Sequence, residues 1–277
     1  MKKIGILFHP LKESAIALAA DLEKFLAAQG IAVWTCSAWE CEHVRGKIHG
    51  TDLILTAGGD GTILRAVNAI APGKTPITGI NLGNVGFMTE FAVEEAKDKL
   101  RHLLEGEGWI DERAVLEATV KNTSGKLLGK HYALNDVVLA RGSVVRVVHI
   151  EAFIDDQPLT TYKADGVIVS TATGSTGYAL AAGGPILHPR AKEIMLLPIM
   201  PHMSASYRLV LPPDTTIRLR LETVYPASLS IDGHVNLSVE TGTEVTVRRS
   251  AHTVRFLRYH PPTEFYGSME KRLKGKY

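Results

Sequence analysis

Short apolar runs alternate with amphipathic segments along the first hundred residues of the chain. Four runs are typical of buried strands, at residues 4–8, 31–35, 52–56 and 76–80. Three segments have the periodicity of helices, at residues 14–29, 62–71 and 93–104. Strands that alternate with helices indicate a parallel sheet covered by helices on both faces.

Beyond Gly108 the pattern changes to strands without intervening helices. Apolar alternation bounded by Pro, Gly, Asn or Asp predicts strands at residues 115–120, 144–154, 216–221, 228–231 and 244–247. This succession predicts an antiparallel all-β domain. We therefore expect an α/β N-terminal domain with a parallel sheet at residues 1–105, the β-rich domain at residues 106–254 and a further segment at residues 255–277.

Composition narrows the class of protein. With 277 residues, of which 45% are hydrophobic, the chain can form one large or two ordinary domains with a sizeable core. There are 31 Lys and Arg against 29 Asp and Glu, and no basic stripe indicates a nucleic-acid partner. Cys36 and Cys41 are too few for a disulfide framework, which favours a reducing cytoplasm.

Nothing in the sequence indicates a membrane protein. No stretch approaches 18 apolar residues, so we expect no membrane-spanning helix. The apolar run at residues 4–8 follows two lysines, as in a signal peptide. It stops at His9 and Pro10, which is too soon for the apolar core of such a peptide.

The most informative segment follows the third predicted strand. Gly58-Gly59-Asp60-Gly61 forms a turn, and a helical pattern opens at Thr62, the expected N-cap. Three glycines leave backbone N–H groups open to a phosphate, and the start of a helix attracts anions. In parallel sheets ligands bind at the carboxyl ends of strands, where this turn lies. The alternative is an ordinary strand-to-helix turn with Asp60 as its cap.

A second polar segment interrupts the β region. Residues 165–169 predict a strand, and Ser170 begins a run of small or hydroxylated residues that reaches Tyr178. Such residues favour turns over helix and sheet, so the run suits a loop around a polyhydroxy ligand. Tyr178 would then offer its ring to a base. The alternative is a Ser/Thr-rich cap of a helix that begins near Tyr178.

Together these segments resemble the NAD kinases, enzymes that phosphorylate NAD to NADP. The matching motifs, in the family's order, lie at residues 58–62, 79–87, 134–136, 165–178, 183–186 and 199–202. The Gly-Gly-Asp-Gly turn alone is shared with lipid kinases, whereas residues 170–178 are more specific. A lipid kinase and a non-catalytic NAD-binding regulator are the alternatives. The polar segment argues against the first, because a lipid needs an apolar channel, and the intact Asp60 argues against the second.

The resemblance implies a role for each matching residue. Asp60 corresponds to the general base that accepts the proton of the adenosine 2′-hydroxyl. Gly58, Gly59, Gly61 and Thr62 correspond to the donor-phosphate loop. Residues that would contact NAD are Asp60, Gly61, Arg65, Asn135, Asp136, Arg146, Lys163, Asp165, Thr173, Thr176, Gly177, Tyr178, Ala179, Leu180, Ala181 and His234. No residue is expected to be a metal ligand.

Within this set, Asn135 and Asp136 would hold the ribose and adenine side of NAD, and Asp165 the nicotinamide end. The chain departs from the family pattern at a few positions. Asp136 stands where Glu is commoner, and Ala172 and Gly177 stand where Pro and Ala are usual. These departures bear on fine substrate preference, because none removes a reactive group.

The expected chemistry is phosphoryl transfer from ATP, with polyphosphate as the alternative donor. Since the chain lacks a P-loop lysine, a divalent ion, Mg²⁺ carried by ATP, should supply positive charge. By resemblance, the protein forms homodimers or homotetramers, has no nucleic-acid or membrane partner, and returns residues 255–277 to the first domain. The charged residues Lys271, Arg272 and Lys274 in that segment are expected to be solvated.

Overall fold

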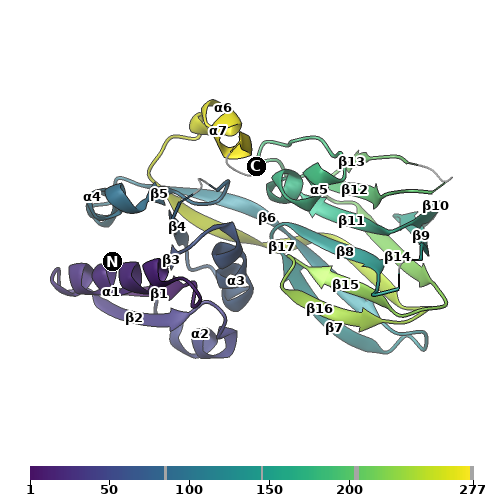
Figure 1. Cartoon of the computed structure of the whole chain (residues 1–277), viewed down its shortest axis with the longest axis horizontal. Helices are drawn as coiled ribbons and strands as arrows, with labels where there is room; N and C mark the ends of the chain where they lie inside the picture. The colour runs from purple at the N-terminus through teal and green to yellow at the C-terminus, as the bar shows by residue number, and fades with distance from the viewer. Residues whose placement is uncertain (84–85, 145, 203–205, 275–277) are drawn as a thin grey trace. The chain divides into compact units, whose positions relative to one another are not determined.

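The computed structural model of the chain describes residues 1–83, 86–144, 146–202 and 206–274 (Figure 1). The chain forms two compact units. Residues 1–112 and 254–277 form the first unit, and residues 113–253 form the second. Two long strands contribute to both units, β6 (Trp109–Lys121) and β17 (Glu244–Arg258). The chain therefore enters the second unit through β6 and leaves it through β17.

The first unit is an α/β fold around a parallel sheet with the strand order β17-β4-β3-β1-β2 and β5 beside β4. The strands that lie wholly in this unit are β1 (Lys3–Phe8), β2 (Ala32–Ser37), β3 (Leu53–Ala57), β4 (Ile77–Asn81) and β5 (Phe91–Ala92). The helices are α1 (Glu13–Ala27), α2 (Cys41–Lys47), α3 (Asp60–Ile70), α4 (Val93–Leu104), α6 (Glu264–Gly267) and α7 (Met269–Lys274). The parallel α/β arrangement predicted from the sequence is confirmed.

Helices pack on both faces of this sheet. Leu22 of α1 and Leu100 of α4 belong to one buried cluster that also contains Ile80 of β4. Because side chains alternate along a strand, Gly79 points to the other face. A Cβ at Gly79 would lie 2.5 Å from the Cδ1 atom of Ile63 in α3, so only glycine admits this close approach of helix and strand.

Helices α3 and α2 differ from the sequence prediction in ways that have a plain cause. Helix α3 begins at Asp60, two residues earlier than expected, and its N-cap is Gly59. The expectation that Thr62 caps this helix is wrong, because Thr62 lies in the first turn with its hydroxyl buried against Gly58. The seven-residue α2 is absent from the prediction, since it is too short to show helical periodicity. Among the described residues, no helix is long and apolar enough to cross a membrane.

The second unit consists of two antiparallel sheets. One has the order β10-β9-β14-β17, with β6 paired to β17 and β7 paired to β6, and the other has the order β13-β12-β11-β8-β15-β16. The strands not yet bounded are β7 (Leu127–Ala133), β8 (Asp136–Arg141), β9 (Val148–Ile154), β10 (Gln157–Ala164), β11 (Gly166–Thr171), β12 (Ile194–Ile199), β13 (Leu209–Leu211), β14 (Thr216–Glu222), β15 (Ala227–Ile231) and β16 (Val235–Val239). The predicted antiparallel all-β domain is confirmed.

One apolar core lies between these two sheets. Ile150 and Leu219 of the first sheet share a buried cluster with Val137 and Leu229 of the second. Alternation along the strands turns the intervening residues of the second sheet to its outer face. There Ile168 packs with Ala179 of the short helix α5 (Tyr178–Ala181). The polar segment that precedes α5 is therefore attached to the outer face of this sheet.

After β17 the chain remains in the first unit, held by a buried arginine. Arg258 is 6% exposed, and its Nη1 donates to the Glu90 carboxylate at 3.0 Å and to the Met88 carbonyl at 2.7 Å. Its Nε approaches the Asp111 carboxylate at 3.4 Å. The predicted return of the C-terminal segment to the first domain is confirmed. The expectation that Arg272 is solvated is wrong, because it is partly buried and donates to the Gly86 carbonyl.

Replacing Arg258 with Ala should strongly destabilise the protein. The change leaves the carboxylates of Glu90 and Asp111 buried without their cation, which typically costs 3–5 kcal/mol. Urea unfolding of both proteins measures this difference in the free energy of unfolding. The matched control is Arg255→Ala in the same strand, whose pair with Glu112 is exposed and should contribute about 1 kcal/mol or less. Equal losses in the two variants would contradict a dominant role for the buried pair.

Candidate functional site

The first unit presents one carboxylate at the carboxyl end of β3. Asp60 is the first residue of α3, and each of its oxygens accepts a backbone N–H bond. Phe87 N donates to Oδ2 at 2.9 Å, and Met88 N donates to Oδ1 at 3.1 Å. A Cβ on Gly86 would lie 2.1 Å from Oδ1, so the backbone of this segment lies directly against the carboxylate. The side chain of Asp60 is thereby held in one position.

A pocket of about 310 Å³ lies beside the glycine turn. Gly59, Gly61 and Thr62 line it together with Lys12 and Arg65. A Cβ added at Gly59 or Gly61 would meet no atom within 4 Å, so the backbone there is open. Lys12, Arg65 and the start of the eleven-residue α3 contribute positive charge, and the carboxylate of Asp60 at that helix start opposes them. The structure thus brings four of the predicted residues together in a pocket whose charge suits phosphate.

In the second unit, the turn before β8 is held by an aspartate. Asp232, between β15 and β16, accepts backbone N–H bonds from Leu134 at 2.8 Å, Asn135 at 2.8 Å and Asp136 at 3.0 Å. Its own backbone has the left-handed φ of 50°, which turns the chain toward these donors. Asp232 therefore fixes the position of the predicted Asn135-Asp136 pair.

The carboxyl groups of Asp136 and Asp232 are both buried. Burial, with the charge of Asp232 as a second cause, raises the pKa of Asp136 to about 7. Burial also raises the pKa of Asp232 to about 6, against the opposing effect of its three N–H bonds. Because Asp232 accepts those bonds as an anion, Asp136 is the member of the pair that takes up a proton first. Near neutral pH, Asp136 can therefore act either as a donor or as an acceptor.

A second pocket, of about 370 Å³, opens at this pair. Asn135, Asp136 and Tyr178 line it, together with Ser230 and Asp232. Tyr178 is 47% exposed. The Oδ1 atom of Asn135 is buried, and it has no hydrogen-bond partner among the described residues. The pocket thus combines an aromatic ring with an amide side chain and a titrating carboxyl group, which suits a nucleoside.

The hydroxyl-rich run before Tyr178 forms an internal network. Residues Thr173–Thr176 make a 3-10 turn, and the segment is buried from Ser170 onward until that turn ends. The Thr171 hydroxyl donates to the Leu134 carbonyl at 2.6 Å, and the Ser175 hydroxyl donates to the Ala172 carbonyl at 2.6 Å. The alternative interpretation, a Ser/Thr-rich cap that leads into α5, is wrong, because the N-cap of α5 is Gly177 and no side chain caps that helix. The hydroxyls serve the fold, whereas Tyr178 lines the pocket.

Close backbone packing joins this run to the Asn135 turn. The Ser170 hydroxyl and the Thr171 N–H both donate to the Asn135 carbonyl, at 3.1 and 2.9 Å. A Cβ on Gly174 would lie 2.3 Å from the same oxygen. Glycine is therefore required at 174, and the two polar segments singled out in the sequence form one structural element.

The other predicted NAD contacts of the second unit are not among the residues that line this pocket. Asp165 pairs with Arg141 at 3.2 Å, between β10 and β11. Arg146 is exposed, and its guanidinium lies 5.8 Å from the centre of the Tyr225 ring. His234 follows the Asp232 turn, and its Nδ1 lies 3.2 Å from the Asp232 carbonyl oxygen. The remaining predicted residues of this unit are Lys163 in β10, Thr173 and Thr176 in the 3-10 turn, and Gly177, Ala179, Leu180 and Ala181 in or beside α5. Asn84 and Val85 of the matching motifs lie outside the described residues.

The chain matches known proteins along almost its whole length. Residues 34–108 match the family model of the ATP-NAD kinase N-terminal domain, and residues 134–259 match that of the C-terminal domain. The NAD kinase of Dehalococcoides mccartyi strain CBDB1 is 48% identical over 99% of this chain and 96% of its own length. The NAD kinase of Chloroflexus aggregans is 39% identical over 99% of both chains. The chain belongs to the NAD kinase family.

Membership of the NAD kinase family confirms the activity predicted from the sequence, phosphorylation of NAD to NADP. Solved structures agree on the fold. Yeast NADH kinase in complex with NADH has a TM-score of 0.90 at 24% identity, over 99% of this chain and 88% of its own. The NAD kinase from Archaeoglobus fulgidus in complex with ATP has a TM-score of 0.79 at 23% identity, over 99% of both chains.

The sequence analysis missed one site residue in each unit, Lys12 in the first and Asp232 in the second. Lys12 follows β1, and His9 beside it donates its N–H to the Ala57 carbonyl at 3.1 Å. The rule that ligands bind at the carboxyl ends of strands could have singled out this loop. Asp232 lies in an Asp-Gly turn after a predicted strand and looked like ordinary turn chemistry. Its partners are 96 to 98 residues away in sequence, so no local pattern reveals them.

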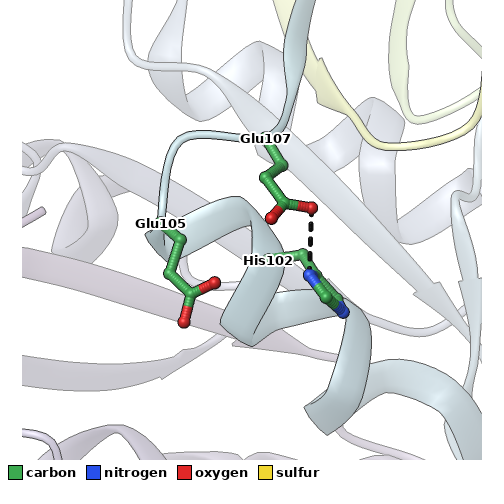
Figure 2. A group of neighbouring side chains, drawn as sticks. All are labelled: His102, Glu105 and Glu107. Carbon is green, nitrogen blue, oxygen red and sulfur yellow. Dashed lines mark ion pairs between the residues drawn. The ribbon is translucent and has the colours of Figure 1, made fainter.

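One group of side chains has the composition of a metal site. Figure 2 shows His102 and Glu107 facing each other at the end of α4, with Glu105 to one side. The His102 Nδ1 atom lies 3.0 Å from a Glu107 oxygen. Both glutamates are exposed, and the ion pair accounts for the arrangement of the first two side chains.

The stability of the protein should depend on pH through Asp136. Its pKa is raised to about 7 in the folded chain, so the folded state binds a proton that the unfolded state releases near pH 4. Stability therefore falls as pH rises from about 4 to about 7. Asp136→Asn removes this titration. In urea unfolding at several pH values, the free energy of unfolding of the variant should fall less over this range than that of the unmodified chain, with a difference of up to about 4 kcal/mol.

The control for this measurement is Asp156→Asn, because Asp156 is exposed and also lies in the second unit. Its unfolding free energy should follow that of the unmodified chain at every pH. If the Asp136 variant also follows the unmodified chain, the carboxyl group does not titrate in the range given.

Proposed function

We propose that Asp60 is the general base of an NAD kinase reaction in which ATP, or another phosphoryl donor, phosphorylates the 2′-hydroxyl of the adenosine ribose. The position of Asp60 carries this proposal. Its carboxylate lies at the carboxyl end of β3, is held by two backbone N–H bonds, and begins the helix that lines the basic pocket. A carboxylate fixed beside a phosphate-binding surface has a chemical use only if it accepts a proton or binds a cation.

The pocket in the second unit supports binding of the adenosine part of NAD. The amide side chain of Asn135 lines the pocket and can bond a ribose or adenine group, and Asp136 can serve as donor or acceptor. The exposed ring of Tyr178 can stack on the base. The same polar lining disfavours a lipid acceptor, whose acyl chains need apolar surface. We further propose that NAD contacts Gly61, Arg65, Arg146, Lys163, Asp165, Thr173, Thr176, Gly177, Ala179, Leu180, Ala181 and His234.

The pocket in the first unit supports binding of the donor phosphates. Lys12 and Arg65 supply charge, and the open backbone at Gly59 and Gly61 supplies N–H donors. The chemistry of this lining fits phosphate oxygens, and a divalent ion would be carried by the donor itself. When bound, Mg²⁺ neutralises charge on the triphosphate.

In the proposed reaction, the 2′-oxygen of NAD attacks the terminal phosphorus of the donor while Asp60 accepts the hydroxyl proton. The bond from that phosphorus to its bridging oxygen breaks, so NADP and ADP are formed when ATP is the donor. Phosphoryl transfer passes through a loose transition state, and positioning with charge stabilisation supplies most of the catalysis. Lys12 and Arg65 would stabilise the charge on the donor oxygens.

The proposal extends to the compartment and the oligomeric state of the protein. Cys36 is a free, buried thiol, as suits a reducing cytoplasm. Strands β13 and β16 lie at the edges of their sheet and would permit pairing with a second chain. We therefore expect a cytoplasmic homodimer or homotetramer.

Replacing Asp60 with Asn should abolish most turnover, because the variant has no base. Loss of a general base typically lowers kcat 10²–10⁴-fold, and binding of NAD measured by calorimetry should persist. Asn also turns an amide N–H toward a backbone donor, since both oxygens of Asp60 accept N–H bonds. Thermal unfolding of the variant measures how much structure this second effect disturbs.

Asp52→Asn is the matched control for Asp60. The Asp52 carboxylate likewise accepts two backbone N–H bonds, from Lys2 and Lys3, and it is exposed in the same unit. Both of these bonds end on Oδ2, so the amide oxygen of Asn can keep them, and this variant, which loses only the charge, should keep its kcat. Near-normal turnover in Asp60→Asn would remove the base assignment.

Replacing Tyr178 with Ala should weaken binding of NAD far more than binding of ATP. Stacking on a base contributes roughly 1–3 kcal/mol, which corresponds to an increase in the KM for NAD of about 5- to 150-fold. Steady-state kinetics with each substrate varied in turn measures both constants. Tyr132→Ala removes a ring from β7, outside the pocket, and should leave both constants unchanged. Equal damage to both substrates in the Tyr178 variant would mean that its ring supports the fold.

A further inference from the structure

The segment around Phe87 connects Asp60 to the C-terminal part of the chain. On one side, the N–H groups of Phe87 and Met88 donate to the Asp60 carboxylate. On the other, the carbonyls of Gly86 and Met88 accept hydrogen bonds from Arg272 and Arg258. All of these residues belong to the first unit. Two cations therefore act on the same piece of backbone that holds the proposed base.

Arg272 is held firmly for a residue near the end of the chain. It lies in α7, its side chain is partly buried, and its Nε donates to the Ser268 hydroxyl at 2.7 Å. Burial lowers the pKa of its guanidinium, and the charge of Arg258 lowers it further. The carboxylates of Glu264, Asp60 and Glu90 act in the opposite direction. The charge of Arg272 is thus close enough to Asp60 for each to act on the other.

The peptide bond between Gly86 and Phe87 transmits this charge. Its carbonyl, on Gly86, accepts from Arg272, and its N–H, on Phe87, donates to Asp60 Oδ2 at 2.9 Å. A cation at the oxygen of a peptide group polarises that group, and its N–H becomes a stronger donor. One planar peptide therefore carries two charge-assisted hydrogen bonds in series, from the guanidinium to the carboxylate.

Arg258 does not occupy an equivalent place. It donates to the Met88 carbonyl, which shares its peptide group with the N–H of Thr89, and that N–H does not bind Asp60 among the described contacts. Its charge is also matched by the buried carboxylates of Glu90 and Asp111. The carbonyl bonded to Arg272 is therefore the one whose own peptide group reaches the base.

We propose that Arg272 is a positioning residue for catalysis, which fixes Asp60 through the Gly86–Phe87 peptide. The proposal rests on the function of Asp60 proposed above. The C-terminal segment then serves the reaction although it touches no substrate. Because the contact orients the base and leaves both substrate pockets alone, its loss lowers kcat and spares the Michaelis constants.

The experiment compares Arg272→Met with Lys271→Met, its neighbour in α7. Both variants lose one positive charge, and Lys271 is exposed. In Arg272→Met we expect kcat to fall about 10-fold or more, equivalent to about 1.4 kcal/mol in the barrier, with the KM values for NAD and ATP changed less than about twofold. Lys271→Met should leave all three constants unchanged. Unchanged kcat in Arg272→Met would overturn the proposal.

Conservative variants separate positioning from support of the fold. Arg272→Lys keeps a cation able to donate to the Gly86 carbonyl and should retain more activity than Arg272→Met. If both fail equally and both lose thermal stability, Arg272 supports the fold alone and the proposal is overturned. Ser268→Ala removes the hydroxyl that accepts the hydrogen bond of Arg272 Nε, and it is the variant to test if Arg272→Met does not fold. It should lower kcat in the same direction by a smaller factor, and an unchanged kcat would contradict the proposal.

A spectroscopic measurement tests the contact without reference to activity. The amide proton of Phe87 donates to a carboxylate, and its NMR resonance should move upfield in Arg272→Met as that bond weakens. The same resonance should not move in Lys271→Met. An unmoved resonance would overturn the proposal whatever the kinetics. A moved resonance in a chain whose Asp60→Asn variant remains fully active would instead uphold the contact and refute the base assignment.

Discussion

The first unit depends on one buried arginine. Arg258 joins the end of β17 to Glu90 and Asp111, so a strand, a loop and the start of the β6 strand meet at a single guanidinium. Arg258 supplies a cation to both buried carboxylates, and Glu90 also accepts the backbone N–H bonds of Tyr259 and His260 at 2.8 Å. Its bond to the Met88 carbonyl then fixes the segment whose N–H groups hold Asp60. The buried charge cluster around Arg258 therefore also anchors the Met88 end of the segment that holds Asp60.

The two units use the same device to fix a polar turn. In each, an aspartate accepts backbone N–H bonds from a segment remote in sequence. Asp60 accepts two such bonds from residues 87 and 88, and Asp232 accepts three from residues 134–136. Backbone donors have no rotamers of their own, so these bonds set positions more rigidly than a pair of flexible side chains would. In the first unit the held group is itself the candidate for chemistry, whereas in the second the carboxylate positions Asn135 and Asp136.

The buried polar residues around the second pocket are of two kinds, those whose hydrogen bonds are satisfied within the fold and those that are unsatisfied or titrate. The hydroxyls of Thr171 and Ser175 saturate nearby carbonyls and so serve the fold. Asn135 keeps a buried acceptor without a partner among the described residues, and Asp136 has a pKa raised to about 7. Unsatisfied or titrating groups of this kind are costly in the free protein. They are therefore the better candidates for ligand contacts than the more numerous hydroxyls beside them.

The sequence by itself determined the class of each unit and the NAD kinase family. Hydrophobic periodicity is a local property, and it predicted the strands around Leu55 and Ile80, the helix at residues 93–104 and the antiparallel region. The glycine turn at Asp60 and the loop before Tyr178 are likewise contiguous motifs. Only the tertiary structure decided that Asp232 fixes the Asn135 turn, that Lys12 lines the basic pocket and that Arg272 leaves solvent to bind the Gly86 carbonyl. Each of these depends on residues brought together by folding, and a sequence pattern records only what lies within one element.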